Sequence, residues 1–131
     1  MRVVIDTNIF VSSFFGGKPR RIIDRWKNAG LTLCLTDAIL DEYMRVLESM
    51  ELNQSELSDL LQLFREQHRV VYKSDTPELE IVDSDPSDNK FLEAAVTLEA
   101  QFIISGDSDL LTIEQYLGIV IISPAEFLDR G

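Results

Sequence analysis

The residues best suited to chemistry in this chain are acids that follow short apolar runs. The run "VVI" ends at Asp6, and the later run "FIIS" leads to Asp107, with Asp109 two residues further on. Such runs predict buried strands, and carboxylates gathered beside them repel one another unless a cation lies among them. Carboxylate oxygens are the ligands that Mg²⁺ and Mn²⁺ prefer. The pattern predicts a divalent metal site, with turn formers or helix caps as the alternative for each Asp.

Two further acids lie on predicted helices. Glu42, in "ILDEYMRVL", lies at the margin of an apolar helix face, where its carboxylate can reach a cleft or remain solvated. In "DSDPSDNKFLEAA", Asp85 can cap a helix whose first residue is Pro86. Asp88 then falls on the core-facing side, three residues before Phe91. A carboxylate at that position is expected to face a site rather than open solvent.

The elements that must position these acids alternate between strands and helices. Strands are predicted at 2–5, 31–35, 69–72, 101–105 and 118–122, and helices over 18–30, 36–51, 53–68, 89–100 and from 123 onward. This order predicts an α/β fold, a three-layer sandwich with a central, mainly parallel five-stranded sheet. In such a sheet the ligand site lies beyond the carboxyl ends of the strands, which is where Asp6 and Asp107 fall.

Length and composition predict one domain over residues 1–131, because the chain can bury a single core but not two. A leader and a long apolar span are both missing, and Cys34 is the only cysteine, so we expect a cytoplasmic, disulfide-free protein with no membrane segment. The net charge of −11 argues against a nucleic-acid partner. This objection is weakened if several of the acids hold a metal ion, because the positive charge of the ion would offset their negative charge.

A group of basic residues lies between the first two predicted strands. Lys18, Arg20, Arg21 and Arg25 fall within eight residues, and we expect them to bind RNA, with a solvated helix face as the alternative. The chain contains one histidine, His68, so a ribonuclease mechanism that needs two histidines is excluded.

The ordered set "IDTN", a Glu in an amphipathic helix, "DPSDNKFLEAA" and "IISGDSDLL" resembles the PIN-domain family, especially its VapC-like branch of toxins from toxin–antitoxin pairs. The resemblance covers essentially the whole chain. It implies a metal-dependent endoribonuclease that hydrolyses RNA phosphodiester bonds with Mg²⁺ or Mn²⁺. It also implies a cognate antitoxin as partner, and homodimers are common in the family.

The resemblance assigns roles to individual residues of this chain. Those that match the acidic quartet of the family are Asp6, Glu42, Asp88 and Asp107. Among these, Asp6, Asp88 and Asp107 are expected to ligate metal and Glu42 to ligate metal or orient water. Asp109 matches a less constant fifth acid that also reaches the metal. Asn8 matches a polar position that supports the ligands through hydrogen bonds.

Three other classes fit parts of the pattern. A receiver domain, in which clustered acids hold Mg²⁺ and one accepts a phosphoryl group, has a similar length, but it needs a lysine where this chain has Ser123 and Pro124. A PIN fold that binds without catalysis is the second alternative, and the complete acidic set argues against it. A dinucleotide-binding fold fits least, because no glycine-rich loop follows Ile5.

Overall fold

A six-stranded sheet forms the centre of the protein. The computed structural model describes residues 1–79 and 88–130. The strands are β1 (Arg2–Ile5), β2 (Thr32–Thr36), β3 (Val70–Lys73), β4 (Phe102–Ile104), β5 (Gln115–Tyr116) and β6 (Ile119–Ile122), in the spatial order β3-β2-β1-β4-β6-β5. All neighbouring strands are parallel except β5 and β6. The predicted mixed α/β architecture with a mainly parallel sheet is confirmed.

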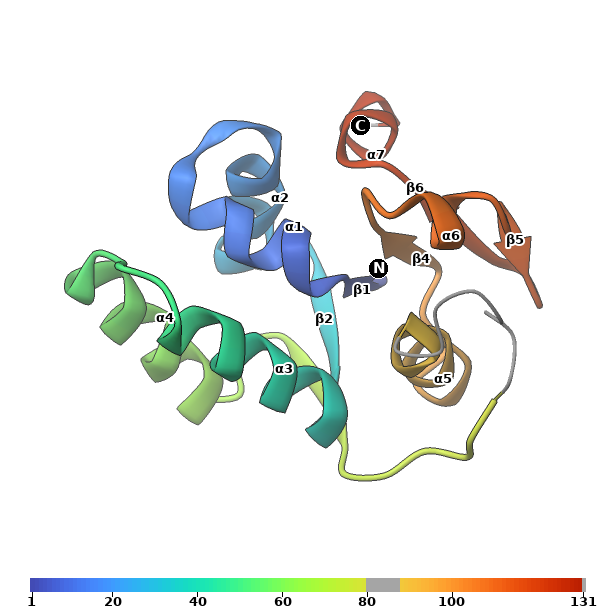
Figure 1. Cartoon of the computed structure of the whole chain (residues 1–131), viewed down its shortest axis with the longest axis horizontal. Coiled ribbons are helices and arrows are strands. Elements are labelled where there is room, and N and C mark those ends of the chain that lie inside the picture. The colour runs from blue at the N-terminus through green and yellow to red at the C-terminus, as the bar shows by residue number, and fades with distance from the viewer. Residues whose placement is uncertain (80–87, 131) are drawn as a thin grey trace.

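Strand β1 lies inside the sheet, and its apolar residues Val3, Val4 and Ile5 are fully buried. It pairs with β2 on one side and with β4 on the other, with Ile5 opposite Ile104. The chain builds the sheet outward from β1 to β2 and β3, and it later returns to add β4 and β6 on the other side (Figure 1). The strand order therefore reverses between β1 and β4, the point at which open α/β sheets bind their ligands.

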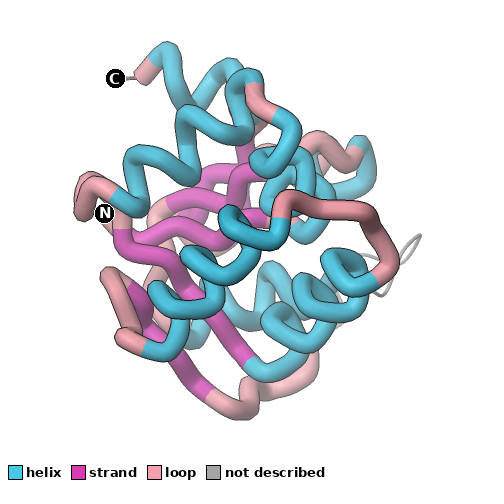
Figure 2. The backbone as a smooth tube through the Cα atoms, turned by 90° about the vertical axis from the view of Figure 1, so that its left-hand side faces the viewer, coloured by secondary structure: helices cyan, strands magenta, loops and turns pink. Residues whose placement is uncertain are grey.

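The helices cover both faces of the sheet (Figure 2). They are α1 (Thr7–Ser12), the 3₁₀ helix η1 (Ser13–Phe15), α2 (Gly17–Lys27), α3 (Asp37–Glu48), α4 (Gln54–Arg65), α5 (Asn89–Thr97), α6 (Ser108–Leu111) and α7 (Pro124–Asp129). Helix α5 packs on β1, β2 and β4, whereas α1 contacts α2 and α3, and α2 contacts α7. Buried aromatic residues, including Trp26, Phe10 and Tyr43, fill the core between them. No helix among the described residues has the length and apolar character to cross a membrane.

The predicted number of five strands was wrong, because β5 adds a sixth. The residues Leu117 and Gly118 have positive φ angles of 50° and 84° and form a two-residue turn between β5 and β6. Backbone twist in such turns matches that of the flanking strands, so the two short strands pair antiparallel. With only two residues and no apolar alternation, β5 gives too weak a sequence pattern to predict.

Residues 7–15, which the sequence pattern left unassigned, form α1 and η1. The Asp6 carboxylate accepts a hydrogen bond of 2.9 Å from the Ile9 amide and so caps α1. Helix α5 begins at Asn89, and Asp88 directly before it has a helical backbone with φ −78° and ψ −14°. Whether Asp88 is the third residue of a helix that starts at Pro86, as we predicted, depends on residues outside those that the structure describes. The predicted cap at Asp85 lies outside the described residues.

The β5–β6 turn gives a test of this topology. Leu117 is 74% exposed and has a left-handed backbone, which disfavours leucine but suits asparagine. We expect Leu117→Asn to raise the free energy of unfolding by about 0.5–1 kcal/mol, measured by urea denaturation. Leu117→Ala is the control, because it also removes the exposed side chain but keeps the backbone penalty. An equal increase in the free energy of unfolding for the two variants would contradict the left-handed turn geometry at Leu117.

Candidate active site

Asp6 lies at the carboxyl end of β1 and is only 4% exposed. One carboxylate oxygen accepts the Ile9 amide, and the other accepts a hydrogen bond from the Ser105 hydroxyl. Burial raises the pKa of Asp6, and the nearby charge of Asp107 raises it further, against hydrogen bonds from Ser105 and from the backbone of Ile9 and Gly106 that lower it. The environment therefore disfavours the charged form of Asp6 unless a cation binds nearby.

Ser105, which is completely buried, connects the ends of β1 and β4. Its hydroxyl oxygen donates to Asp6 and accepts the Asp107 amide at 2.9 Å. Asp107 in turn caps α6, because one of its carboxylate oxygens accepts the amides of Asp109 at 2.8 Å and Leu110 at 3.4 Å. The helix-cap interpretation of Asp107 is thus correct for one oxygen, and the same side chain also borders the acidic cleft.

Asp88, Asp107 and Asp109 form a cluster of carboxylates. Each offers one oxygen, and these three oxygens lie within 4.8 Å of one another. Metal–oxygen distances of about 2.1 Å are typical of Mg²⁺, so ligand oxygens around one ion lie roughly 3–4 Å apart. The donor set and its spacing fit a hard divalent cation. Asp6 lies outside this group of three and borders the same cleft.

Glu42 projects from α3 and has a partner on each oxygen. The Thr7 hydroxyl donates to Oε1, and the Lys90 ammonium forms an ion pair with Oε2 at 2.8 Å. Burial on its own would raise the pKa of Glu42. The hydrogen bonds from Lys90 and Thr7 and the positive charges of Lys90 and Arg45 outweigh burial, and the pKa lies below its usual value. Glu42 is therefore charged and oriented by contacts with α1 and α5.

Tyr43 fixes α3 against the end of the central strand. Its buried hydroxyl donates to the Ile5 carbonyl, next to Asp6. Its ring stacks on Phe10 of α1, with a centroid distance of 4.1 Å and an interplanar angle of 8°. The helix that carries Glu42 is thus held in register with the strand that delivers Asp6.

An open cleft of ≈ 270 Å³ collects these side chains. It is lined by Asp6, Thr7, Asn8, Glu42, Arg45, Val46, Asp88, Phe91 and Asp107. The structure therefore brings together the four predicted acids and Asn8, which is exposed at the start of α1. Asp109 joins them through its proximity to Asp88 and Asp107. Their catalytic and metal-binding roles stay predictions.

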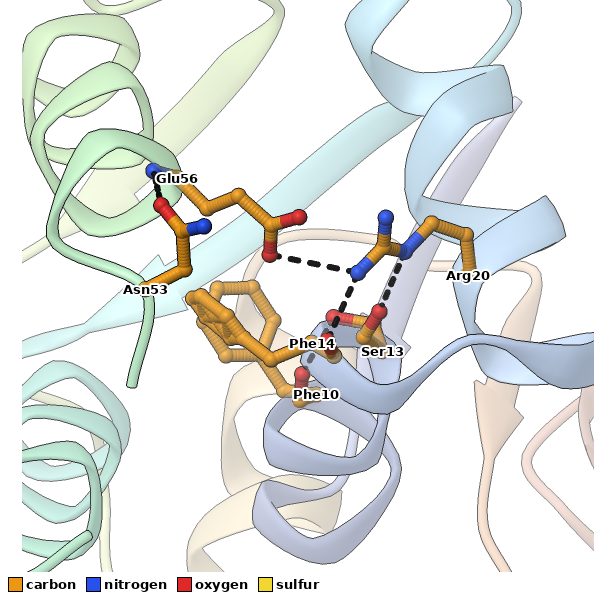
Figure 3. A network of polar contacts seen from close by, with 6 residues as sticks. All are labelled: Phe10, Ser13, Phe14, Arg20, Asn53 and Glu56. Atoms are coloured by element: carbon orange, nitrogen blue, oxygen red, sulfur yellow. Dashed lines mark hydrogen bonds and ion pairs between the residues drawn. The ribbon is translucent and has the colours of Figure 1, made fainter. Parts of the chain in front are cut away.

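The predicted basic group is placed elsewhere, since none of Lys18, Arg20, Arg21 and Arg25 lines the cleft. Arg20 donates to the carbonyls of Ser13 and Phe14, each at 2.7 Å, and pairs with Glu56 at 3.2 Å (Figure 3). Through these contacts Arg20 connects the carboxyl-terminal end of the α1–η1 segment to α4. The Arg25 guanidinium lies 5.5 Å from the centre of the Phe127 ring. Binding of RNA by these residues remains a prediction, and Arg20 has a structural role within the fold.

Four residues of the site were not singled out from the sequence. They are Thr7, Arg45, Lys90 and Ser105. Three of them lie within two residues of a predicted acid, in "DTN", "DNK" and "SGD", and Arg45 follows Glu42 by about one helical turn. That proximity was the available signal, but a hydroxyl or a cation next to an acid does not by itself show which way its side chain points.

Comparison with known proteins places this chain in a family. A model of the PIN domain matches residues 2–109, and the chain belongs to the PIN-domain family. A chain in the crystal structure of VapBC2 from Rickettsia felis bound to a DNA fragment from their promoter has a similar fold, with a TM-score of 0.59 and 13% sequence identity. The alignment covers 94% of this chain and 98% of that chain. No curated protein matches the sequence.

The crowding of acids predicts opposite effects of one substitution with and without metal. Asp107→Asn removes a negative charge near Asp6 and Asp88 but leaves an oxygen that can still cap α6. In chelator we expect the variant to be more stable than wild type by about 1 kcal/mol, because repulsion is relieved. With saturating Mn²⁺ the difference should vanish or reverse, because binding to the folded state adds RT ln(1 + [L]/Kd) and the variant has lost a ligand.

Thermal melts in EDTA and in Mn²⁺ measure both differences. Asp41→Asn is the matched control, because Asp41 is an exposed acid of α3 outside the cleft and the change in net charge is the same. If Asp107→Asn follows this control in both conditions, Asp107 is a helix cap and not part of a metal site.

Proposed function

We propose that this protein is a metal-dependent endoribonuclease, with Asp6, Glu42, Asp88 and Asp107 as the acids of its active site and Asp109 as an additional ligand. The observation that carries the proposal is the convergence of acids from four separate segments on one cleft at the switch point of a PIN-domain sheet. The family match favours this function over a receiver domain. The complete acidic set favours it over a PIN fold that only binds.

The residues present divide into a metal-binding group and a supporting group. Asp88, Asp107 and Asp109 would hold Mg²⁺ or Mn²⁺, with Asp6 next to them at the end of β1. A divalent ion at that position activates water and stabilises the charge on the leaving oxygen of a phosphodiester. Ser105 holds Asp6 in place, and Asn8 offers an amide at the rim of the cleft. No side chain needs to act as a covalent nucleophile.

We further propose that the protein is the toxin of a toxin–antitoxin pair and acts in the cytoplasm, where its RNA substrate is found. Support comes from the PIN-domain match and from the similar fold found in the VapBC2 structure. The partner would be a protein antitoxin that blocks the cleft or restrains the enzyme. A homodimer is also proposed, following the resemblance of the sequence to the VapC-like branch.

Purified protein is expected to cleave single-stranded RNA with Mg²⁺ or Mn²⁺ and to lose this activity in EDTA. Asp88→Asn should reduce the rate by more than about 100-fold, a larger loss than a supporting residue usually causes. Asp41→Asn, which changes the same charge outside the cleft, should cleave like wild type. Cleavage that persists in EDTA, or in Asp88→Asn, would contradict the proposed site. RNA binding without any cleavage would favour the non-catalytic alternative.

The proposed role as a toxin predicts an effect on growth. Induced expression of the wild-type chain in a bacterial host is expected to slow growth, because cleaved RNA cannot be translated. Expression of Asp88→Asn at the same level should leave growth unchanged. Growth curves and immunoblots of the two cultures measure this. Equal growth of both cultures, with soluble and active enzyme in the first, would contradict the toxin role and leave the ribonuclease activity intact.

A further inference from the structure

Arg45 is a cation of the acidic cleft that forms no ion pair with a carboxylate among the described residues. The structure has two ion pairs between described residues, Arg20 with Glu56 and Lys90 with Glu42. Arg45 lines the same cleft as the acids but forms no ion pair or hydrogen bond through its side chain with any described residue. It is also exposed. Its guanidinium can therefore meet a ligand in solution without breaking an existing contact.

The backbone that carries Arg45 is held rigidly beside the proposed centre. Arg45 lies in the last turn of α3, three residues after Glu42. The helix is fixed by the Tyr43 hydrogen bond to Ile5 and by the contacts of Glu42 with Thr7 and Lys90. Arg45 and Glu42 line the same cleft, so the guanidinium lies on the side of α3 that faces the acids.

A cleft of this composition needs such a cation if it is to take RNA. The chain has a net charge of −11, and the cleft contains four carboxylates, so an incoming polyanion is repelled. Metal binding would offset the negative charge of the acids, but the RNA phosphates on either side of the metal would still need a positively charged partner. The planar guanidinium of arginine matches the geometry of a phosphate and forms two parallel hydrogen bonds with it.

We propose that Arg45 binds a backbone phosphate of the RNA strand adjacent to the one that is cleaved. The inference rests on the proposed function and adds to it a substrate-binding residue on α3. It also gives the strand a direction across the cleft, from the acids at the ends of β1 and β4 along α3 toward its carboxyl-terminal end. The basic residues of α2 are not required for this contact.

Binding of fluorescently labelled single-stranded RNA tests the proposal directly. Anisotropy is measured in EDTA, so that no RNA is cut, over a series of KCl concentrations. For Arg45→Gln we expect binding to weaken about tenfold at low salt, since a hydrogen-bonded contact with a charged group is lost. The slope of log K against log salt should become shallower by roughly 0.7, the value for one phosphate contact on a single strand. Arg45→Lys should keep the slope and lose part of the affinity.

Arg65→Gln is the matched control, because Arg65 is an exposed arginine in the last turn of α4 and does not line the cleft. It loses the same charge and the same interaction with a helix end. The proposal is overturned if Arg45→Gln and Arg65→Gln have equal affinities and slopes. A changed Mn²⁺ affinity in Arg45→Gln with an unchanged salt slope also overturns it, since Arg45 would then act on the acids alone.

Failure of this proposal can be distinguished from failure of the proposed function. If wild type cleaves RNA and Arg45→Gln behaves as the control does, the function stands and the phosphate contact is wrong. If wild type binds RNA without cleaving it and the slope is still reduced in Arg45→Gln, the contact stands and the enzymatic function fails.

Discussion

The hydrogen bond from Ser105 to Asp6 is the interaction on which the rest of the site depends. It joins the ends of β1 and β4, the two strands between which the order of the sheet reverses. The same hydroxyl oxygen accepts the Asp107 amide and so sets the start of α6. Burial of Asp6 is tolerable because its oxygens accept several hydrogen bonds. A buried serine thus fixes the relative positions of the acids that follow both strands.

The acids lie close together, and the negative charge of each is stabilised by different neighbours. Hydrogen bonds from Ser105 and the backbone surround Asp6, and an ammonium group and a hydroxyl hold Glu42. Asp88, Asp107 and Asp109 instead share a space of the size that a small ion requires. The five acids therefore carry the same charge in different environments. Glu42 has an internal counter-ion in Lys90, at 2.8 Å.

The apolar strands and the location of the acids could be predicted from the sequence, because both depend on short local patterns. The runs before Asp6 and Asp107 showed that two strands end in carboxylates, and the rule for parallel sheets placed them together. Helix α1 was missed because the signal for its start is Asp6 itself, which was interpreted as a site residue. It serves both purposes, since it caps α1 and borders the cleft.

Side-chain direction could not be predicted in the same way. Arg20 and Arg45 are both basic residues on amphipathic helices, and composition favoured the first as a nucleic-acid contact because other cations lie near it. In the folded chain Arg20 turns inward to the carbonyls of Ser13 and Phe14, and Arg45 lines the cleft. The difference depends on the packing of α2 against η1, which is near in the sequence, and against α4, where Glu56 lies 36 residues from Arg20.

The position of β1 inside the sheet also affects how the protein is made. One edge of β1 pairs with β2, which follows about thirty residues later in the sequence. The other edge pairs with β4, which follows about one hundred residues later. During translation the first part of the sheet can assemble while the acids beyond β4 are still unsynthesised. The cleft is completed only after Asp107 and Asp109 have emerged from the ribosome. Any property that depends on the complete acidic cleft therefore arises only after β4 has joined the sheet beside β1.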